Sequence, residues 1–317
     1  MKPHRAKPFL VFLLFGVLAG AVALAWTFSA ATLQPAALQT VELPPATPPQ
    51  GMSLSALPTG SMTSRAAFAY RGGRFGDERE FAMTAVLVRH PRGDLLFDTG
   101  FGRHLEQHLA LQPALMRATA NFSKGTPAAD QLAAHGFDTG RLAGVVLTHA
   151  HWDHVSGLDS LPGVPVWVNA AERDFIAGGG DMTSVARSLD RLEFKLYRFT
   201  DRPYLGFAQS LDVWGDGSVV LVPAAGHTPG SMIAFITLPS GARYALLGDL
   251  VWQAEGIDLP AERPWISRAL ADVDASAVRE NIARVAAIHR RFPQIRMLPA
   301  HDARAMGSLP VFPTAAQ

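Results

Sequence analysis

Four side chains that can bind a metal ion are crowded into one short segment of the sequence, Thr-His-Ala-His-Trp-Asp-His at positions 148–154. They are His149, His151, Asp153 and His154. The segment directly follows the apolar residues 145–147, which predict a short buried strand ending in a polar loop. A lone histidine is more often structural than a ligand, but no simple core role explains this density. On such a loop, the first two histidines can point to one side and the last two ligands to another, so two adjacent metals become geometrically possible.

Three further candidate ligands each follow another apolar, strand-like run. His227 lies within Gly-His-Thr-Pro-Gly, where the flanking glycines and the proline favour a tight turn that holds the histidine inward. Asp249 follows residues 244–247, and His301 follows the apolar pair at 297–298. Each signal is weak alone, because a Gly-Asp pair is usually only a turn. Together, in this order, the seven residues predict one site assembled from several strand ends.

Composition narrows the chemistry of that site. The sequence has no cysteine, so thiolate ligands and a cysteine nucleophile are excluded. Imidazole and carboxylate ligands suit zinc, and also iron or manganese. The formal net charge is +1, and three basic residues lie among the first seven positions, which leaves the rest of the chain close to neutral. A nucleic-acid partner is therefore not expected, since a phosphate binder usually carries a basic excess. A small-molecule substrate is expected instead.

The remaining pattern predicts strands and helices mixed along the body. Expected strands cover residues 82–88, 95–97, 145–147, 164–168, 219–222, 233–237 and 244–247, and expected helices cover 103–118, 128–135, 170–176 and 275–291. His104 and His108 share one face of the first of these helices. Their spacing does not match the HExxH metal-binding pattern, so a solvated or pocket-lining face is the better interpretation.

The strings THAHWDH, GHTPG, GD and PAHD together resemble the metallo-β-lactamase superfamily, in its HxHxDH dinuclear hydrolase branch, over residues 82–302. The resemblance implies an α+β fold, a four-layer αββα sandwich with the site at one edge of its two sheets, here after an N-terminal apolar helix. It also implies two metal positions bridged by Asp249. One would be held by His149, His151 and His227, and the other by Asp153, His154 and His301. Asp98, which ends an early strand, matches an acidic residue that supports a ligand from behind, although it is also a plausible turn residue.

This ligand set predicts a metal-dependent hydrolase, with two zinc ions as the expected cofactor. A hydroxide that bridges two dications is a nucleophile at neutral pH, and the metals can polarise the substrate carbonyl. Asp153 or Asp249 is then a candidate proton carrier and so a catalytic residue. Trp152 and Trp252, beside metal ligands in the sequence, are candidate apolar walls of a substrate pocket.

Residues 133–158 and 165–175 most resemble the acyl-homoserine lactonase group, so a lactone or a carboxylic ester is the expected substrate. Those lactonases carry a tyrosine three positions after the bridging aspartate, whereas this chain has Trp252, which cannot act as an acid. Three alternatives stay open: a glyoxalase-II-like thioesterase, an iron-dependent sulfur dioxygenase, and a non-catalytic, membrane-tethered metal-binding module. The sequence does not indicate an oligomeric state.

An apolar run without charge covers residues 9–26 and follows Lys2, Arg5 and Lys7. This pattern predicts a signal anchor or a signal peptide over residues 1–27. Residues 28–61 are rich in proline and alanine, as in a linker, and the hydrolase domain is expected over 62–317. Because the basic residues precede the apolar run, the body is expected outside the cytoplasm, either anchored in the inner membrane and facing the periplasm or exported.

Overall fold

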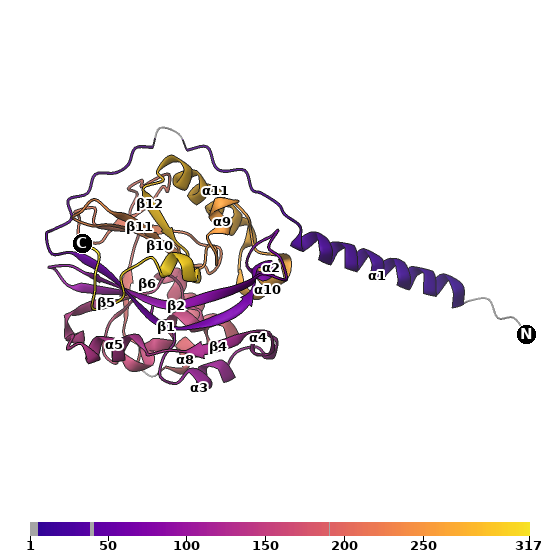
Figure 1. Cartoon of the computed structure of the whole chain (residues 1–317), viewed down its shortest axis with the longest axis horizontal. Coiled ribbons are helices and arrows are strands. Elements are labelled where there is room, and N and C mark those ends of the chain that lie inside the picture. The colour runs from indigo at the N-terminus through magenta and orange to yellow at the C-terminus, as the bar shows by residue number, and fades with distance from the viewer. Residues whose placement is uncertain (1–5, 39–40, 190) are drawn as a thin grey trace, which may run out of the picture.

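Two β-sheets packed face to face form the body of the protein, with helices on their outer faces (Figure 1). The computed structural model describes residues 6–38, 41–189 and 191–317, and within its helices the side chains of residues 6–14, 115, 118 and 119 are not described. The first sheet has the strand order β4-β1-β2-β3-β5-β6-β7, and the second has the order β12-β11-β10-β9-β8. Both sheets mix parallel and antiparallel pairs.

The bounds of the elements are as follows. The strands are β1 (Ser53–Arg65), β2 (Glu78–Arg89), β3 (Asp94–Phe97), β4 (Asn121–Lys124), β5 (Leu142–Val146), β6 (Val166–Asn169), β7 (Phe194–Tyr197), β8 (Leu211–Asp212), β9 (Val219–Pro223), β10 (Met232–Thr237), β11 (Arg243–Leu246) and β12 (Ile295–Leu298). The α-helices are α1 (Ala6–Phe28), α2 (Ala66–Ala69), α3 (Leu105–Ala110), α4 (Ala114–Thr119), α5 (Ala128–Ala134), α6 (Trp152–Val155), α7 (Ala170–Gly178), α8 (Ser184–Ser188), α9 (Glu255–Asp258), α10 (Trp265–Ala271), α11 (Ala275–Arg291) and α12 (Ala303–Met306). Short 3-10 helices are η1 (Thr139–Arg141), η2 (Ser156–Ser160) and η3 (Asp181–Thr183).

Three apolar clusters show how the layers are stacked. The central cluster joins the inner faces of the two sheets and includes Val86 of β2 and Leu221 of β9. On the outer face of the first sheet, Leu87 of the same strand β2 packs with Leu132 of α5. On the outer face of the second sheet, buried residues of β9 and β10 pack with Ile282 and its neighbours on α11. Successive residues of a strand point to opposite faces, so each sheet contributes to two clusters. The expected α+β, four-layer αββα sandwich is confirmed.

The expected strands and helices are found with small shifts at their ends, except in one place. The predicted helix over 103–118 is two short helices, α3 and α4, because Pro113 cannot continue α3 and instead precedes the first turn of α4. The longest helix of the body, α11, has the predicted bounds. Asp274 caps its first turn by accepting hydrogen bonds from the backbone of Ser276 and Ala277, and its last turn is basic.

The folded body begins earlier than the sequence indicates. The expected boundary at Met62 falls inside β1, which pairs with β2 from Ser53 onwards. Pro58 and Gly60 obscure this strand in the sequence, since both disfavour strand interiors, and the structure has a register shift between them. The preceding chain lies along the body rather than being a free linker. Its backbone donates to the body at three points, from Leu33 to Pro260 (2.8 Å), from Ala36 to Ala283 (3.0 Å) and from Thr47 to Asp216 (2.7 Å).

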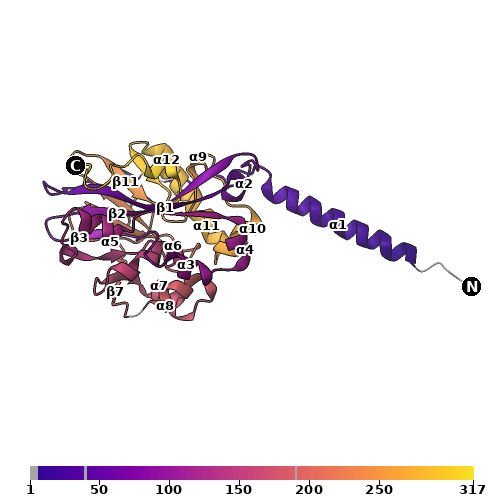
Figure 2. The same ribbon diagram turned by 60° about the horizontal axis from the view of Figure 1, so that its bottom comes forward.

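Helix α1 projects away from the body, and its last turn is docked next to α2 and α10 (Figures 1 and 2). The backbone of Trp265 donates to the Thr27 hydroxyl at 2.5 Å, and the Arg71 guanidinium lies 4.5 Å from the ring centre of Trp26. In the part of the chain that the structure describes, none of the helices has the length and apolar character needed to span a bilayer. Residues 1–5 of the expected signal segment lie outside the described residues, and its role as an anchor or a signal peptide remains a prediction.

Candidate metal centre

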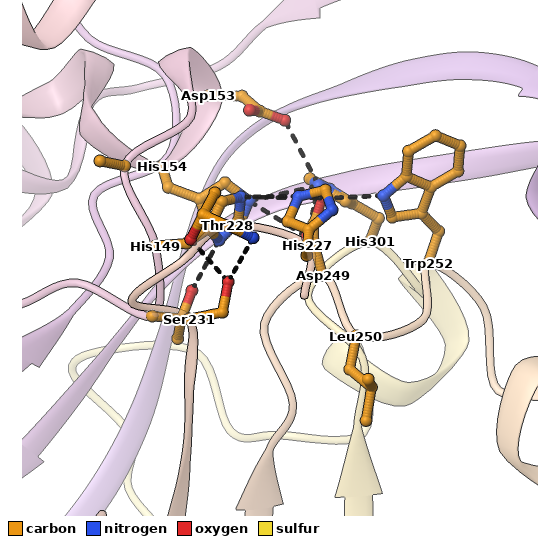
Figure 3. Close-up of polar contacts among 12 residues, drawn as sticks. His149, Asp153, His154, His227, Thr228, Ser231, Asp249, Leu250, Trp252 and His301 are labelled. Atoms are coloured by element: carbon orange, nitrogen blue, oxygen red, sulfur yellow. Dashed lines mark hydrogen bonds and ion pairs between the residues drawn. The ribbon is translucent and has the colours of Figure 1, made fainter. Parts of the chain in front are cut away.

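The candidate ligands come together at one edge of the sandwich, on loops that leave the ends of strands in both sheets (Figure 3). The loop after β5 and the first turn of α6 supply four of them, the β9–β10 turn supplies His227, and the segments after β11 and β12 supply Asp249 and His301. Two glycines make the close approach possible. Gly226 has φ +141° and packs on the backbone of Val278, while at Gly248 (φ +52°) a Cβ atom would lie 2.9 Å from Thr148.

The three histidines assigned to one metal position form a compact group. The Nε2 atoms of His149 and His227 are 3.1 Å apart, and the ring centre of His151 lies 4.4 Å from that of His227. One ligand atom from each residue lies within 4.8 Å of the others. All three side chains are buried, with exposed fractions of 4% or less. The structure thus brings together residues separated by 78 positions in the sequence.

The second group contains Asp153, His154 and His301. The Nε2 atoms of the two histidines are 3.3 Å apart, and an Asp153 oxygen lies 3.3 Å from Nε2 of His301. Asp249 lies between the two groups. Its Oδ1 is 3.2 Å from His154 and 3.1 Å from His301, whereas its Oδ2 is 3.4 Å from His227. This placement is what a bridging carboxylate requires.

The hydrogen bonds on the far side of the rings determine which nitrogens are free for a metal. The Nδ1 atoms of three histidines face oxygen acceptors: His154 faces Asp98 at 2.8 Å, His227 faces Asp272 at 2.8 Å, and His301 faces the Ala82 carbonyl at 2.9 Å. An acceptor at Nδ1 holds the proton on that nitrogen, so Nε2 presents a lone pair.

Lone pairs that face each other in a buried space repel unless a cation lies between them. The Nε2 atoms of His149 and His227, 3.1 Å apart, form such a contact, and the buried Nε2 of His151 has no hydrogen-bond partner among the described residues. The donor set, nitrogen and carboxylate oxygen, is that of zinc and similar divalent ions. The residues present therefore fit a pair of metal ions.

The electrostatics of the site point the same way. Burial lowers the pKa of His149 and His151 well below 6.5, and neighbouring histidines lower it further. Burial also acts on His154, but three carboxylates, led by Asp98, outweigh it and raise the pKa of His154 well above 6.5. The first pair is thus neutral, the form that binds a metal, and the second group has an excess of negative charge that attracts a cation.

Burial works against ionisation of Asp249 as well, yet His301 and His154 hold the pKa of this carboxyl well below 3.8. Asp249 is therefore an anion in the site, as a bridging ligand must be.

Comparison with known proteins shows to which family the chain belongs. The model of the metallo-beta-lactamase superfamily matches residues 80–310, most of the chain. The chain belongs to this superfamily. It is therefore a hydrolase with a histidine and aspartate metal-binding site, and the ligands predicted from the sequence are the ones that the structure groups together.

Several relatives within the superfamily are similar to this chain. A probable metallo-hydrolase of Mycobacterium tuberculosis is 32% identical over 244 residues, which cover 68% of this chain and 73% of the relative. The N-acyl homoserine lactonase AttM of Rhizobium johnstonii is 26% identical over 213 residues, covering 64% and 74%. A solved N-acyl homoserine lactone hydrolase, with N-hexanoyl-L-homoserine bound at its catalytic metal centre, shares the fold with a TM-score of 0.67 and 18% identity, covering 83% and 98%.

Asp98 lies behind the ligands, as expected, and is more than a turn residue. Its Oδ1 accepts from the Thr148 backbone at 2.7 Å, and its Oδ2 accepts from the Thr148 hydroxyl at 2.7 Å and faces Nδ1 of His154. The backbone of Asp98 is left-handed, with φ 52°, which is unfavourable for a residue other than glycine. This strain at a buried position is typical of a functional site.

Sequence reasoning missed three residues that hold the ligand loops. Glu172 is buried on α7, and its two oxygens accept from the backbone of Ala150 at 2.6 Å and of Gly230 at 2.9 Å. It therefore ties the loop that carries His149 to the turn that carries His227. Asp272 and Arg263 form an ion pair behind His227. Of these, only Glu172 had a signal, because it lies in the lactonase-like segment 165–175.

The two tryptophans differ from the expectation and from each other. Trp152 belongs to the core rather than to a pocket wall: it is 5% exposed, stacks on Phe101 at 5.5 Å between ring centres and packs edge-on against Phe122. As the first residue of α6, it points away from the ligands on either side of it, which the spacing alone did not reveal. Trp252 is half-buried at the site, and its Nε1 donates to Asp249 Oδ2 at 2.8 Å.

Proposed function

We propose that the chain is a dinuclear, zinc-dependent hydrolase that cleaves a lactone or a carboxylic ester. The observation that carries the proposal is the position of Asp249, with one oxygen directed to the group of His154 and His301 and the other to that of His227. A structural neighbour described as a dizinc lactonase supports the choice of metal, with a TM-score of 0.52 and 16% identity over 83% of this chain and 91% of the neighbour.

In the proposed mechanism, the metals activate the water and the substrate, and the side chains hold the metals. When bound, two dications supply a nucleophile derived from water at neutral pH and polarise the carbonyl of the substrate. His149, His151 and His227 would hold one, Asp153, His154 and His301 the other, and Asp249 would bridge them.

Of the two candidate proton carriers, Asp153 is better placed than Asp249. The side chain of Asp249 is 5% exposed, and its oxygens are engaged by histidines and by Trp252. The side chain of Asp153 is 12% exposed, so it lies nearer to solvent. We therefore assign to Asp153 the transfer of a proton between the reacting water and the leaving group, and to Asp249 the fixed negative charge.

The choice of substrate rests on several observations that support one another. AttM relatives are N-acyl homoserine lactonases by name, and a similar fold carries the ring-opened product of such a lactone. The near-neutral chain favours an uncharged substrate over a phosphodiester. Half-buried Trp252 offers an aromatic surface beside Asp249, which suits an acyl chain.

A substrate panel on the purified, zinc-loaded protein tests the proposal. We expect turnover of lactones and esters, two metal ions per chain, and no turnover by an Asp249→Ala control that retains the folded circular dichroism spectrum. Turnover confined to glutathione thioesters would favour the thioesterase alternative. Iron with oxygen consumption would favour a dioxygenase, and metal binding without any turnover a non-catalytic module. Each of these results would contradict the proposal.

Export remains a proposal of its own. It is supported by the sequence, where Lys2, Arg5 and Lys7 precede the apolar residues 9–26 and no basic cluster follows. A reporter that is active only outside the cytoplasm, fused after Thr47, should be active. An expressed fusion whose reporter is inactive would contradict export, and the size of the mature chain would separate an anchor from a cleaved signal.

A further inference from the structure

The indole of the half-buried Trp252 directs its N–H edge toward the metal ligands. Its Nε1–H donates to Oδ2 of Asp249 at 2.8 Å, and this N–H is the only polar group of the side chain (Figure 3). The ring edge packs against Phe81, with 6.0 Å between centres. Because Oδ2 is also the oxygen nearest His227, the hydrogen bond fixes the rotation of the carboxylate that would bridge the two metals.

A buried arginine lies over one face of the same indole. Arg263 is 2% exposed, and its guanidinium carbon is 4.8 Å from the ring centre of Trp252. Its Nη1 donates to the backbone carbonyl of Asp249 at 2.8 Å, and its Nη2 contacts Asp272, the carboxylate behind His227. Arg263 therefore donates directly to the backbone of Asp249. It also contacts the two side chains next to the site, the indole of Trp252 and the carboxylate of Asp272, which supports His227.

We propose that Arg263 and Trp252 act as one positioning unit that sets the orientation of Asp249 between the two metal positions. A cation over an indole face is held by the π electrons and draws on them, which makes the N–H on the ring edge a stronger donor. A donor to an anionic carboxylate is worth more than a neutral hydrogen bond, particularly where water is excluded. Neither residue needs to touch the substrate. They are positioning residues, not catalytic ones.

A consequence for substrate choice rests on the proposed function. Since the Nε1–H of Trp252 is engaged by Asp249, it is not available to a departing alkoxide, and an indole cannot supply a proton. The leaving group must then depend on Asp153 and on the metals. The preferred substrates are therefore lactones and esters whose alcohols are good leaving groups, and rates should fall steeply as the alcohol becomes more basic.

An ordinary structural role would produce a different outcome from the one proposed here. If Arg263 served only to neutralise Asp272, removal of the indole N–H would leave metal binding unchanged, and the effects of changing the two residues would be independent. If the two residues are one unit, the loss of the N–H alone weakens the bridge, and the effect of changing Arg263 becomes smaller once the N–H is gone.

The experiment uses the full-length protein with four single variants. Trp252→Phe keeps an aromatic ring and removes the N–H, and Trp265→Phe, at a 60% exposed position, is its matched control. Arg263→Lys keeps the charge and loses the planar fork. Its control is Arg279→Met, an arginine whose ion pair with Glu262 does not involve a ligand. Binding of zinc is measured by competition with a chelator, the geometry by the visible spectrum of the cobalt(II) form, and folding by thermal denaturation.

We expect Trp252→Phe to bind the metal pair about 10- to 100-fold more weakly, to alter the cobalt(II) spectrum and to lower kcat more than it changes KM, with an unchanged melting temperature of the metal-free protein. Both controls should match the wild type, and the Trp252→Phe/Arg263→Lys double variant should lose less than the product of the two single effects. Wild-type affinity and spectrum in Trp252→Phe would overturn the inference alone. A wild-type protein that binds no metal would overturn it together with the proposed function.

Discussion

Two histidine-rich segments of this chain, residues 149–154 and 104–108, place their side chains in different surroundings. Between 149 and 154, three histidines and an aspartate direct their free atoms into one buried space together with ligands from three other loops. Between 104 and 108, two histidines one helical turn apart face local partners instead. His104 pairs with Asp159 at 3.0 Å, and the buried His108 faces the Ser156 hydroxyl at 2.8 Å. They line a cavity of about 470 Å³ to which none of the seven ligands contributes.

The difference lies in what each ring nitrogen faces, not in the number of histidines. At the metal centre, oxygen acceptors hold the Nδ1 atoms and the Nε2 atoms converge. Beside the cavity, the only nearby carboxylate, within the lining residues that the structure describes, is Asp159, and it accepts from the backbone of Arg103 and His104 at the start of α3. Asp159 thus holds the backbone that leads into α3, and the histidine pair has no converging anionic ligand among the described lining residues.

The largest expected effect comes from removing the residue that joins the two halves of the metal centre. Asp249→Ala should lower kcat/KM by about 10³-fold or more, because bound metals contribute several kcal/mol of transition-state stabilisation. Steady-state kinetics with an excess of zinc measure the effect, and unfolding curves show whether the fold is retained. A folded variant with activity near that of the wild type would remove Asp249 from the centre.

The Glu172→Gln variant tests whether the metal centre depends on the hydrogen bonds that join its two ligand loops. In Glu172→Gln, the side-chain amide must face one of the backbone donors that the carboxylate now accepts, so a buried N–H loses its partner. We expect a loss of about 1–3 kcal/mol in the free energy of unfolding and a metal affinity about tenfold lower. Urea denaturation and chelator competition measure the two quantities. Unchanged metal affinity would show that the two loops hold their positions independently.

The sequence predicts the ligands well and their supports poorly, for a physical reason. Each ligand segment follows an apolar strand, so the neighbouring sequence is enough to predict its position at the sheet edge. Asp98 is found in the same way, because it follows an apolar strand. Glu172 lies on α7 and Asp272 in the short segment between α10 and α11. Only tertiary packing brings Glu172 behind Ala150 and Asp272 behind His227.

Tertiary structure also explains the two other differences between prediction and structure, the start of the folded body and the direction of Trp152. The start of the body at Ser53 was missed because Pro58 and Gly60 interrupt the strand pattern, whereas pairing with β2 over twelve positions outweighs their local preference. Trp152 was misplaced because sequence proximity to ligands does not fix direction on a helical turn, where adjacent side chains diverge.

His108, which lines the cavity, should affect the pH dependence of the free energy of unfolding rather than catalysis. Burial lowers its pKa below 6.5, so the unfolded chain takes up the proton more readily. The stability due to its neutral form is complete above pH 6.5 and is lost as the pH falls below that value. His108→Gln should therefore lose less free energy of unfolding between pH 7.5 and 5.5 than the wild type, each with saturating zinc. An equal or larger loss in the variant would contradict this assignment.

His104 should give the smallest effect. Its side chain is about half exposed, and its contact is with a carboxylate already engaged by the backbone. We expect His104→Ala to change kcat/KM by less than about twofold and the free energy of unfolding by no more than about 0.5 kcal/mol. A loss of metal or a large drop in turnover, measured beside Asp249→Ala, would mean that the two histidine segments act together.

Anomalous X-ray scattering at the zinc edge, from crystals of the purified protein, locates the bound metal ions. Two peaks per chain are expected, about 3.5 to 4 Å apart, with Asp249 between them. We also expect His149, His151 and His227 to surround one peak, Asp153, His154 and His301 to surround the other, and no peak to lie beside His104 and His108. A single peak, or peaks that leave His227 or His301 unbound, would contradict the dinuclear metal centre.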